Sequence, residues 1–281
     1  MKRIYIEITN LCNLHCRFCL RPDRKQTVMT PDQFRTIITQ SKPYTDYVYL
    51  HVQGEPLLHP RFEEIMDICD AYGMKVQLVT NGTMPERIPD PIRHPSLRKV
   101  SFSVQSIDDR PDADAHEYIA DVVTACRRLS EAGITAAEIR FWQKTPAPGS
   151  ASAACLQYLK DHCTFIPDSR QRNFRIMDHV YVDFADEFEW PSLSHPLISE
   201  TGTCHGAIDQ IAVLSDGTAV PCCLDAGGAV KLGNIFETSL ESILQSEAYR
   251  SLTEGFRRNE LREELCRRCG FRTHFDKTVS K

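Results

Sequence analysis

Three cysteines near the N-terminus have a spacing suited to metal chemistry. Cys12, Cys16 and Cys19 form a C-x3-C-x2-C pattern within one short loop. Three thiolates on one loop can bind an iron–sulfur cluster, but a cubane has four irons and these cysteines serve only three. The fourth iron is left open, as in catalytic metal sites that keep a position for a substrate or cofactor. A tetrahedral zinc site completed by His15 is the alternative, which the spacing disfavours because zinc motifs come in CxxC pairs.

A second group of cysteines lies near the other end of the chain. The sequence has 12 cysteines, many for a chain whose start, Met1-Lys2-Arg3 and a short strand with Glu7, does not resemble a signal peptide. In a reducing cytosol they would not form disulfides, so metal ligation is the leading explanation. The C-terminal group consists of Cys204, Cys222, Cys223, Cys266 and Cys269. We therefore expect a cytoplasmic protein with two separate metal sites.

Composition limits the classes of partner. The 281 residues are 42% hydrophobic and 25% charged, with a net charge of −5. A mildly acidic chain gives no electrostatic reason to expect nucleic acid or an anionic membrane as the main partner. No apolar run approaches the length of a membrane span, so no transmembrane helix is expected.

Strand and helix patterns alternate along the first part of the chain. Such alternation predicts right-handed βαβ units and a parallel sheet, and about six of them would make a partial (β/α)6 barrel. The predicted fold class is therefore α/β, with the functional groups at the C-terminal ends of the strands. Strands are expected at 4–8, 44–52, 76–79, 100–104, 137–142 and 174–182, and helices after Thr30 and at 60–72, 113–132 and 151–162.

The alternation of strand and helix patterns stops after residue 185. Residues 186–203 contain prolines and a glycine with little periodicity, which is typical of a connector. Residues 204–281 are expected to form a small α+β domain. It begins with a hairpin whose strands, at 211–214 and 218–220, are joined by Ser215-Asp216-Gly217, and Ser239 is expected to cap a helix. The predicted domains are thus 1–185 and 204–281, joined by 186–203.

With these elements placed, residues 2–182 resemble the radical S-adenosylmethionine (SAM) superfamily. The cysteine loop has its C-x3-C-x-aromatic-C pattern, with Phe18 as the aromatic residue. Gln53-Gly54-Glu55-Pro56 resembles a motif that is usually Gly-Gly-Glu-Pro, so Gln53 stands where a glycine is expected. The segments 80–83 and 101–103 resemble those that end the third and fourth strands of that barrel.

The C-terminal domain resembles the SPASM/Twitch type of auxiliary-cluster domain. Cys204, Gly217 and Cys222 match its opening pattern, and Cys266 and Cys269 match its later CxxC. A full SPASM domain would continue with a further cysteine, but this chain has Phe275 at that position. The resemblance is therefore to the shortened Twitch form with one auxiliary cluster.

The resemblance implies two [4Fe–4S] clusters and SAM as cofactors. Cys12, Cys16 and Cys19 would hold the SAM-binding cluster; Cys204, Cys222, Cys266 and Cys269 would hold the auxiliary one. Cys223 competes with Cys222 for one position, and a four-cysteine zinc knuckle is the alternative to the second cluster. For SAM itself, the resemblance assigns Gly54 and Glu55 to the amino group, Ser103 and Arg140 to the carboxylate or ribose, and Phe18 to the adenine end.

The implied activity is reductive cleavage of SAM to a 5′-deoxyadenosyl radical, which abstracts a hydrogen atom from a substrate. A cluster saturated by four thiolates is suited to moving an electron. The first hypothesis is therefore a net oxidation of a small hydroxylated molecule or a peptide, with the auxiliary cluster as electron acceptor. An external donor of flavodoxin or ferredoxin type would supply the first electron. The alternatives are non-oxidative peptide epimerisation or crosslinking and, in another class, a metal-stabilised binding or electron-carrier protein.

Overall fold

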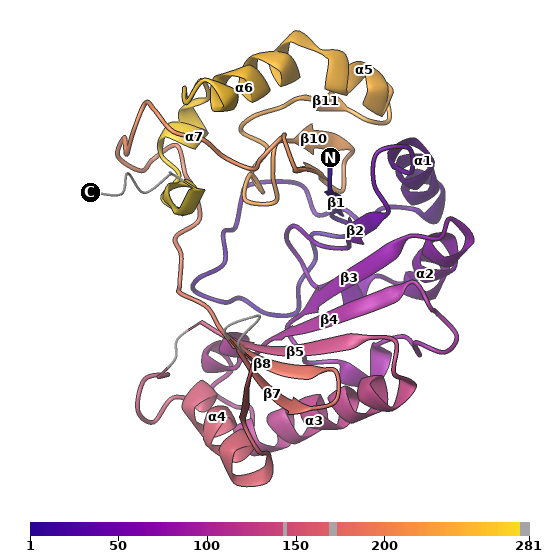
Figure 1. Ribbon diagram of the computed structural model, residues 1–281, viewed down its shortest axis with the longest axis vertical. Helices are drawn as coiled ribbons and strands as arrows, with labels where there is room; N and C mark the ends of the chain where they lie inside the picture. Colours follow the sequence, from indigo (N-terminus) through magenta and orange to yellow (C-terminus); the bar gives the residue numbers. More distant parts are fainter. Residues whose placement is uncertain (143–144, 169–172, 276–281) are drawn as a thin grey trace. The chain divides into compact units, whose positions relative to one another are not determined.

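The computed structural model describes residues 1–142, 145–168 and 173–275. The chain splits into two compact units, each built from segments that are distant in sequence. Unit 1 comprises Met1–Leu11, Phe18–Gly54 and Phe188–Lys281, and unit 2 comprises Cys12–Arg17 and Glu55–Glu187. Figure 1 colours these segments along the sequence, and each unit is described by itself below.

Unit 1 contains a mixed sheet in the order β11-β10-β9-β1-β2. Its strands are β1 (Arg3–Ile6), β2 (Tyr47–Tyr49), β9 (Gln210–Val213), β10 (Thr218–Val220) and β11 (Gly233–Asn234). β1 is parallel to both of its neighbours, and β9 and β10 form an antiparallel hairpin, which confirms the hairpin predicted around Ser215-Asp216-Gly217. The hairpin thus extends the sheet of the N-terminal strand, a pairing that the sequence did not predict.

The two helices of unit 1 that the sequence predicted begin where they were expected. α1 (Pro31–Ser41) starts with a capping box between Thr30 and Gln33 and buries Phe34, Ile37 and Ile38. α5 (Leu240–Gln245) is capped by the hydroxyl of Ser239. They are followed by α6 (Glu247–Arg257), α7 (Glu264–Arg267) and a 3-10 helix, η4 (Phe271–Phe275).

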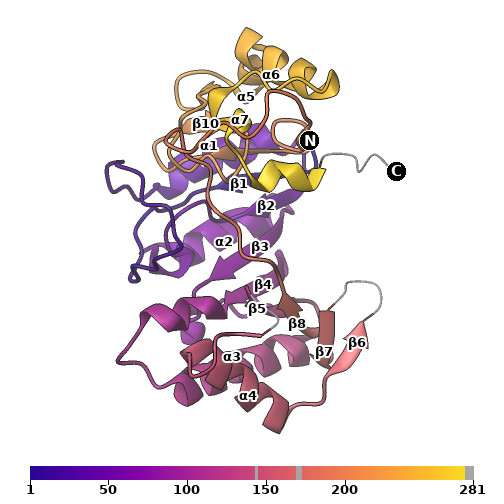
Figure 2. The same cartoon turned by 90° about the vertical axis from the view of Figure 1, so that its left-hand side faces the viewer.

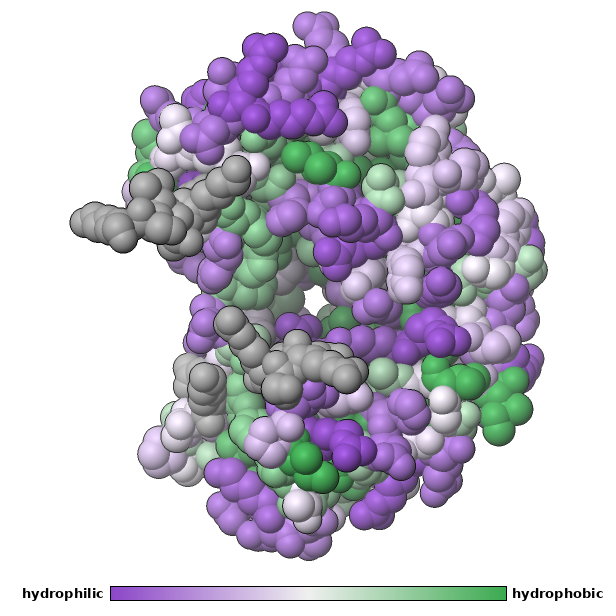
Figure 3. Space-filling model, in the orientation of Figure 1, coloured by the Kyte–Doolittle hydropathy of each residue, from purple (hydrophilic) through white to green (hydrophobic). Residues whose placement is uncertain are grey.

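α6 shows why the charged C-terminal segment lies at a surface. Leu252 and Phe256 are buried, whereas Glu254 and Arg257 are exposed. The surface over this helix is hydrophilic in Figure 3. The helix is therefore amphipathic, with one apolar stripe packed inward.

Unit 2 contains a sheet in the order β3-β4-β5-β8-β7-β6. β3 (Lys75–Thr80), β4 (Leu97–Ser103), β5 (Ala136–Phe141) and β8 (Val180–Phe184) are parallel, as predicted. β7 (Asn173–Met177) and β6 (Ile166–Asp168) are antiparallel additions at one edge. The single strand expected at 174–182 was wrong, because the chain turns at Asp178-His179, where His179 has a φ of 59°.

The helices of unit 2 are α2 (Phe62–Ala71), α3 (Ala115–Ala132) and α4 (Ala151–His162), together with the 3-10 helices η1 (Pro56–Leu58), η2 (Pro85–Arg87) and η3 (Val104–Asp109). α3 is capped at its start by Asp114, whose carboxylate accepts hydrogen bonds from two backbone N–H groups, and at its end by Gly133 in the left-handed region. α3 and α4 pack side by side against the sheet (Figures 1 and 2). Within the described ranges, no helix has the length and apolar character needed to cross a bilayer.

Candidate cluster and cofactor sites

The cluster loop, residues 12–19, follows β1 and belongs partly to each unit. Cys12 and Cys16 belong to unit 2 and Cys19 to unit 1. In unit 2, the Cys12 sulfur accepts the backbone N–H of Leu14 at 3.4 Å. Desolvation raises the pKa of the Cys12 thiol, and this N–H opposes the shift. Cys16 is buried.

Asn81, directly after β3, contacts the same cysteine. Its amide nitrogen lies 3.8 Å from the Cys12 sulfur and donates to the side chain of Asn13 at 2.9 Å. Its backbone carbonyl accepts hydrogen bonds from the hydroxyls of Tyr118 and Ser106, and these hold the C-terminal end of β3 in place. Sequence reasoning identified the segment 80–83 but missed Asn81 as an individual residue. The signal was available, since a polar residue at the C-terminal end of a parallel strand is where sites form.

Glu55 is buried in unit 2 and holds the backbone of two segments. Its Oε2 accepts the N–H of Asn81 at 2.7 Å, and its Oε1 accepts the N–H of Leu57 at 3.0 Å. Burial raises the pKa of this carboxyl, whereas the two backbone hydrogen bonds lower it. The carboxylate is thus positioned by backbone groups, and its contact with the SAM amino group stays a prediction.

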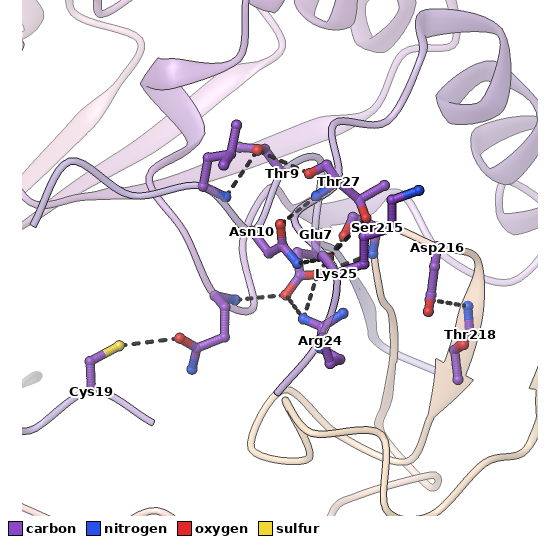
Figure 4. Close-up of polar contacts among 12 residues, drawn as sticks. Glu7, Thr9, Asn10, Cys19, Arg24, Lys25, Thr27, Ser215, Asp216 and Thr218 are labelled. Carbon is purple, nitrogen blue, oxygen red and sulfur yellow. Dashed lines mark hydrogen bonds and ion pairs between the residues drawn. The ribbon is translucent and has the colours of Figure 1, made fainter. Parts of the chain in front are cut away.

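Glu7 organises the corresponding region of unit 1 (Figure 4). This fully buried carboxylate lies 2.7 Å from Arg24 through each of its oxygens. It also accepts the N–H and hydroxyl of Ser215, at 3.1 and 2.9 Å, and the N–H of Gln53 at 3.1 Å. The charge is therefore compensated and hydrogen-bonded, as a buried carboxylate requires. Glu7 was not predicted as a site residue, and only its place on an otherwise apolar strand could have identified it.

Gln53 connects this network to the cluster loop. Its amide oxygen accepts the Cys19 thiol at 3.2 Å (Figure 4). Its Nε2 is buried and has no hydrogen-bond partner in the part of the chain that the structure describes. A buried donor without a partner is costly and indicates that a ligand or a neighbouring group completes the site.

Gly54 lies where no side chain fits. Its φ is 79°, and a Cβ there would lie 2.5 Å from the carbonyl oxygen of Thr9 and 2.8 Å from that of Leu11. The backbone of the motif thus packs directly against the segment that enters the cluster loop. This close approach explains why glycine is needed at the second motif position, while Gln53 is accommodated at the first.

Ser103 and Arg140 lie next to each other in unit 2. They are register partners at the ends of β4 and β5, and Arg140 pairs in turn with Asp183 of β8. The Arg140 Nε lies 3.8 Å from Glu138 and 3.9 Å from Asp183, both longer than a hydrogen bond. Arg140 is therefore held loosely, at the strand ends where the sequence predicted a binding role for it and Ser103.

The same face of this sheet carries further polar side chains. Alternation along β4, β5 and β8 places Lys99, Ser101, Ser103, Glu138, Arg140 and Asp183 on one face, here called the polar face. The Glu138 carboxylate accepts hydrogen bonds from the Lys99 ammonium group at 2.9 Å and from the Ser101 hydroxyl at 2.8 Å. Parallel sheets are usually apolar on both faces, so this polar face is a candidate surface for contact with polar groups. The sequence predicted Ser103 and Arg140 as site residues and included Ser101 only in the segment 101–103, whereas Lys99 and Glu138 were missed.

The C-terminal cysteines interact with one another in unit 1. The Gly206 N–H donates to the Cys204 sulfur at 3.3 Å, and a Cβ at Gly206 would lie 3.5 Å from the Cys222 Cβ. Burial raises the pKa values of the Cys204, Cys222, Cys266 and Cys269 thiols. The neighbouring thiols raise those of Cys204, Cys222 and Cys266 further. A set of neighbouring, half-buried thiols of this kind is stabilised by a bound metal, which deprotonates them.

Cys222 and Cys223 have different surroundings. Cys222 interacts electrostatically with Cys204 and Cys266, and Cys223 interacts with Cys204 as well. Cys223 is hydrogen-bonded to Tyr5, and burial raises the pKa of its thiol to about 11. These contacts support Cys222 as the ligand, a choice that stays a prediction. Phe18, expected at the adenine end, is half-buried in unit 1, and its role also stays a prediction.

The residues present fit the implied cofactors. Thiols are the ligands that iron–sulfur clusters require, and both cysteine groups supply them. Two features are those of a built site: the Gln53 Nε2, which has no partner among the described residues, and the close contacts around Gly54 that leave no room for a side chain. Both observations concern the side of the cluster loop that belongs to unit 1.

Comparison with protein families supports the same assignment. Residues 6–140 match the model of the radical SAM superfamily. Residues 204–270 match the SPASM model, described as an iron–sulfur cluster-binding domain. Together these domains imply SAM and two [4Fe–4S] clusters as cofactors.

A curated relative is the tungsten-containing aldehyde ferredoxin oxidoreductase cofactor-modifying protein of Pyrococcus furiosus. It is 32% identical over 88 residues, which cover 30% of this chain and 25% of the relative. The matches cover between 25% and 49% of the first curated relatives' lengths.

Two solved structures resemble the chain over most of its length. BtrN in complex with AdoMet and 2-DOIA is 15% identical, with a TM-score of 0.55, over 96% of this chain and 92% of that one. Native anSMEcpe with bound AdoMet and Kp18Cys peptide is 15% identical, with a TM-score of 0.59, over 99% and 91%. These similarities concern the fold and confirm the predicted α/β partial-barrel class. The chain therefore carries a radical SAM domain at residues 6–140, followed by a SPASM iron–sulfur cluster-binding domain at residues 204–270.

Proposed function

We propose that this protein is a radical SAM oxidoreductase that couples hydrogen abstraction to net oxidation of a polar substrate. The observation that carries the proposal is the second group of cysteines, of which the Cys204 sulfur and the Cys222 Cβ both lie within 3.6 Å of a Cβ placed at Gly206, with Cys266 and Cys269 in the same unit. Four thiolates would saturate a cubane, and a saturated cluster is suited to accepting an electron rather than binding substrate. Hydrogen abstraction leaves a substrate radical, and its oxidation releases one electron that such a cluster can take.

The first cysteine loop would hold the SAM-binding cluster. Cys12, Cys16 and Cys19 leave one iron open for the methionine end of SAM. When bound and reduced, the cluster would supply the electron that cleaves SAM and generates the abstracting radical. Gly54 keeps the motif backbone close to the loop, and Glu55 fixes the ends of two segments through Asn81 and Leu57.

The polar face would bind the charged or hydroxylated parts of SAM and substrate. Ser103 and Arg140 are adjacent, and the guanidinium of Arg140 is only loosely paired, so it can turn toward a carboxylate. Lys99, Glu138 and Asp183 supply both charges beside them. This composition favours a substrate with hydroxyl, amine or carboxylate groups, either a small hydroxylated molecule or a peptide.

Peptide modification without net oxidation is the second candidate. The structure of anSMEcpe, which this chain resembles in fold, contains a bound peptide. The two candidates differ in whether the electron leaves the substrate. Both reactions can consume one SAM per turnover, but an oxidation passes the electron of the substrate radical to the auxiliary cluster, whereas an epimerisation returns a hydrogen atom to that radical.

Reductive SAM cleavage by the reconstituted protein tests the proposal. With dithionite and SAM, the wild-type protein should form 5′-deoxyadenosine, and a Cys12→Ser, Cys16→Ser, Cys19→Ser variant should form none. Cys163→Ser, at the end of α4, is the matched control and should behave like the wild type. Absence of 5′-deoxyadenosine from the wild type would refute the enzyme assignment and favour a binding or electron-carrier protein.

A second pair of substitutions tests the role of the auxiliary site. Cys266→Ser with Cys269→Ser should leave SAM cleavage largely intact while abolishing substrate oxidation. Equal loss of both activities would mean that the second site is only structural. Peptide and small-molecule candidates are then compared by the product formed per SAM consumed.

A further inference from the structure

Gln53 occupies a fixed position beside the cluster loop. It is 9% exposed, and its backbone N–H donates to the buried carboxylate of Glu7 at 3.1 Å. Arg24 and Ser215 hold that carboxylate in turn. The Glu7 carboxylate is buried and its charge is compensated, so it holds the backbone of Gln53 in a fixed position. From there its amide reaches the sulfur of Cys19.

The orientation of this amide depends on the state of Cys19. With a thiol, the Gln53 oxygen accepts the S–H at 3.2 Å, and Nε2 is left buried without a partner among the described residues. A cluster ligand is a thiolate and has no proton to donate. An amide oxygen facing a thiolate is repelled, whereas an amide N–H facing it forms a charge-assisted hydrogen bond. Rotation of the terminal amide by about half a turn exchanges the two atoms in nearly the same space.

We propose that Gln53 is a positioning residue for the open cluster: in the loaded protein its Nε2 donates a hydrogen bond to the Cys19 sulfur and raises the cluster's reduction potential. The inference rests on the proposed function, since it requires a cluster on the cysteine loop. Reduction adds negative charge, and a donor aimed at a ligand sulfur stabilises the reduced state more than the oxidised one. The same bond gives the buried Nε2 its partner.

The chain's departure from the related motif has a physical role in this account. A glycine at position 53 has no side-chain donor, whereas glutamine brings one to a ligand sulfur. The backbone N–H of residue 53, which contacts Glu7, is available with either residue. The side chain therefore adds a means of setting the potential without changing how the motif backbone is anchored.

Two substitutions and a matched control test the proposal. Gln53→Leu keeps much of the volume and removes the donor, and Gln53→Glu keeps the shape and replaces the donor by an acceptor. The control, Gln245→Leu, changes an exposed glutamine that contacts Glu241 within α5. Each protein is reconstituted anaerobically, its iron is counted, and its reduction is titrated by electron paramagnetic resonance. The signal that changes when SAM is added reports the open cluster.

Gln53→Leu should lower the equilibrium constant for reduction about tenfold, a shift of about 59 mV to more negative potential for one electron. Gln53→Glu should shift it at least as far in the same direction, and Gln245→Leu should not shift it. Glutamine labelled with ¹⁵N at the side-chain amide should show a coupling to the reduced cluster that is lost in Gln53→Glu and kept in Gln245→Leu.

The outcomes separate this inference from the proposed function. A wild-type protein with a SAM-sensitive signal, and unchanged potentials in both Gln53 variants, would overturn the role of Gln53 alone. A wild-type protein with no SAM-sensitive signal would overturn both. If Gln53→Leu does not fold, the reduction potential of Gln53→Glu alone tests the role of Gln53, because glutamate preserves the side-chain shape.

Discussion

The carboxylate of Glu7, directly after β1, accepts hydrogen bonds from both the backbone N–H and the hydroxyl of Ser215, which lies in the turn of the β9–β10 hairpin. Two segments separated by 208 positions are thus joined at one buried charge. Arg24 and Gln53 complete the set of donors around it. The relationship makes the N-terminal strand, the motif after β2 and the C-terminal hairpin parts of one structural unit.

Glu7→Gln should destabilise the protein by about 3 kcal/mol, because removing one partner of a buried ion pair leaves Arg24 uncompensated. Ser215→Ala keeps the backbone donor and should cost about 1 kcal/mol. Denaturant unfolding measures both changes. Asp46→Asn, which breaks a solvent-exposed pair with Lys42, is the control and should cost at most about 0.5 kcal/mol. Similar losses in all three variants would contradict the central position of Glu7.

Gly54→Ala should disrupt the entry to the cluster loop. The added Cβ would lie 2.5 Å from the Thr9 oxygen, so backbone must move in addition to the cost of a left-handed residue. We expect a lower melting temperature and loss of iron from the first cluster on reconstitution. Gly133→Ala is the matched control, since Gly133 has a φ of 72° and, among the described residues beyond its own local backbone, no atom lies within 4 Å of the added Cβ. It should cost only about 1 kcal/mol and retain iron. Equal effects would show that backbone strain alone, and not contact with Thr9, determines the result.

Substitution of the two adjacent cysteines should have opposite outcomes for iron content. Cys222→Ser should lower the iron content from about eight to about four per chain, because Cys222 interacts electrostatically with both Cys204 and Cys266. Cys223→Ser should retain both clusters and lose only the hydrogen bond to Tyr5. Iron analysis and the absorption of the clusters measure this. Iron loss in Cys223→Ser alone would reverse the ligand assignment.

Asp183 should give the polar face a pH-dependent stability. Burial, with the neighbouring charge of Glu138, raises the pKa of its carboxyl above the ordinary value. The contribution of Asp183 to stability is therefore present at pH values below the ordinary pKa of an aspartate and is lost as pH rises through the raised one. Asp183→Asn removes this loss. The difference between its melting temperature and that of the wild type should therefore become more positive from pH 4 to pH 7. Asp178→Asn, at an exposed turn, is the control, and an identical pH profile for it would contradict the prediction.

The sequence by itself determined the features that depend on neighbours along the chain. The helix starts at Thr30 and Ser239 and the stop at Gly133 were predictable, because caps act within about one turn. The hairpin at Ser215-Asp216-Gly217 follows from a local turn signal. The spacing of Cys12, Cys16 and Cys19 is a property of one loop, so its metal chemistry could be inferred without coordinates.

Only the tertiary structure decided the contacts between distant residues. The pairing of β9 with β1, the polar face formed by Lys99 and Glu138, and the contact of Gln53 with Cys19 join residues far apart in sequence. Local patterns do not specify such neighbours, because a strand's partner depends on the packing of the whole sheet. The strand expected at 174–182 was wrong for a related reason. The residue pattern of this segment gave no local signal for the turn at His179. The cysteine spacing indicates the chemistry, and the long-range contacts determine its surroundings.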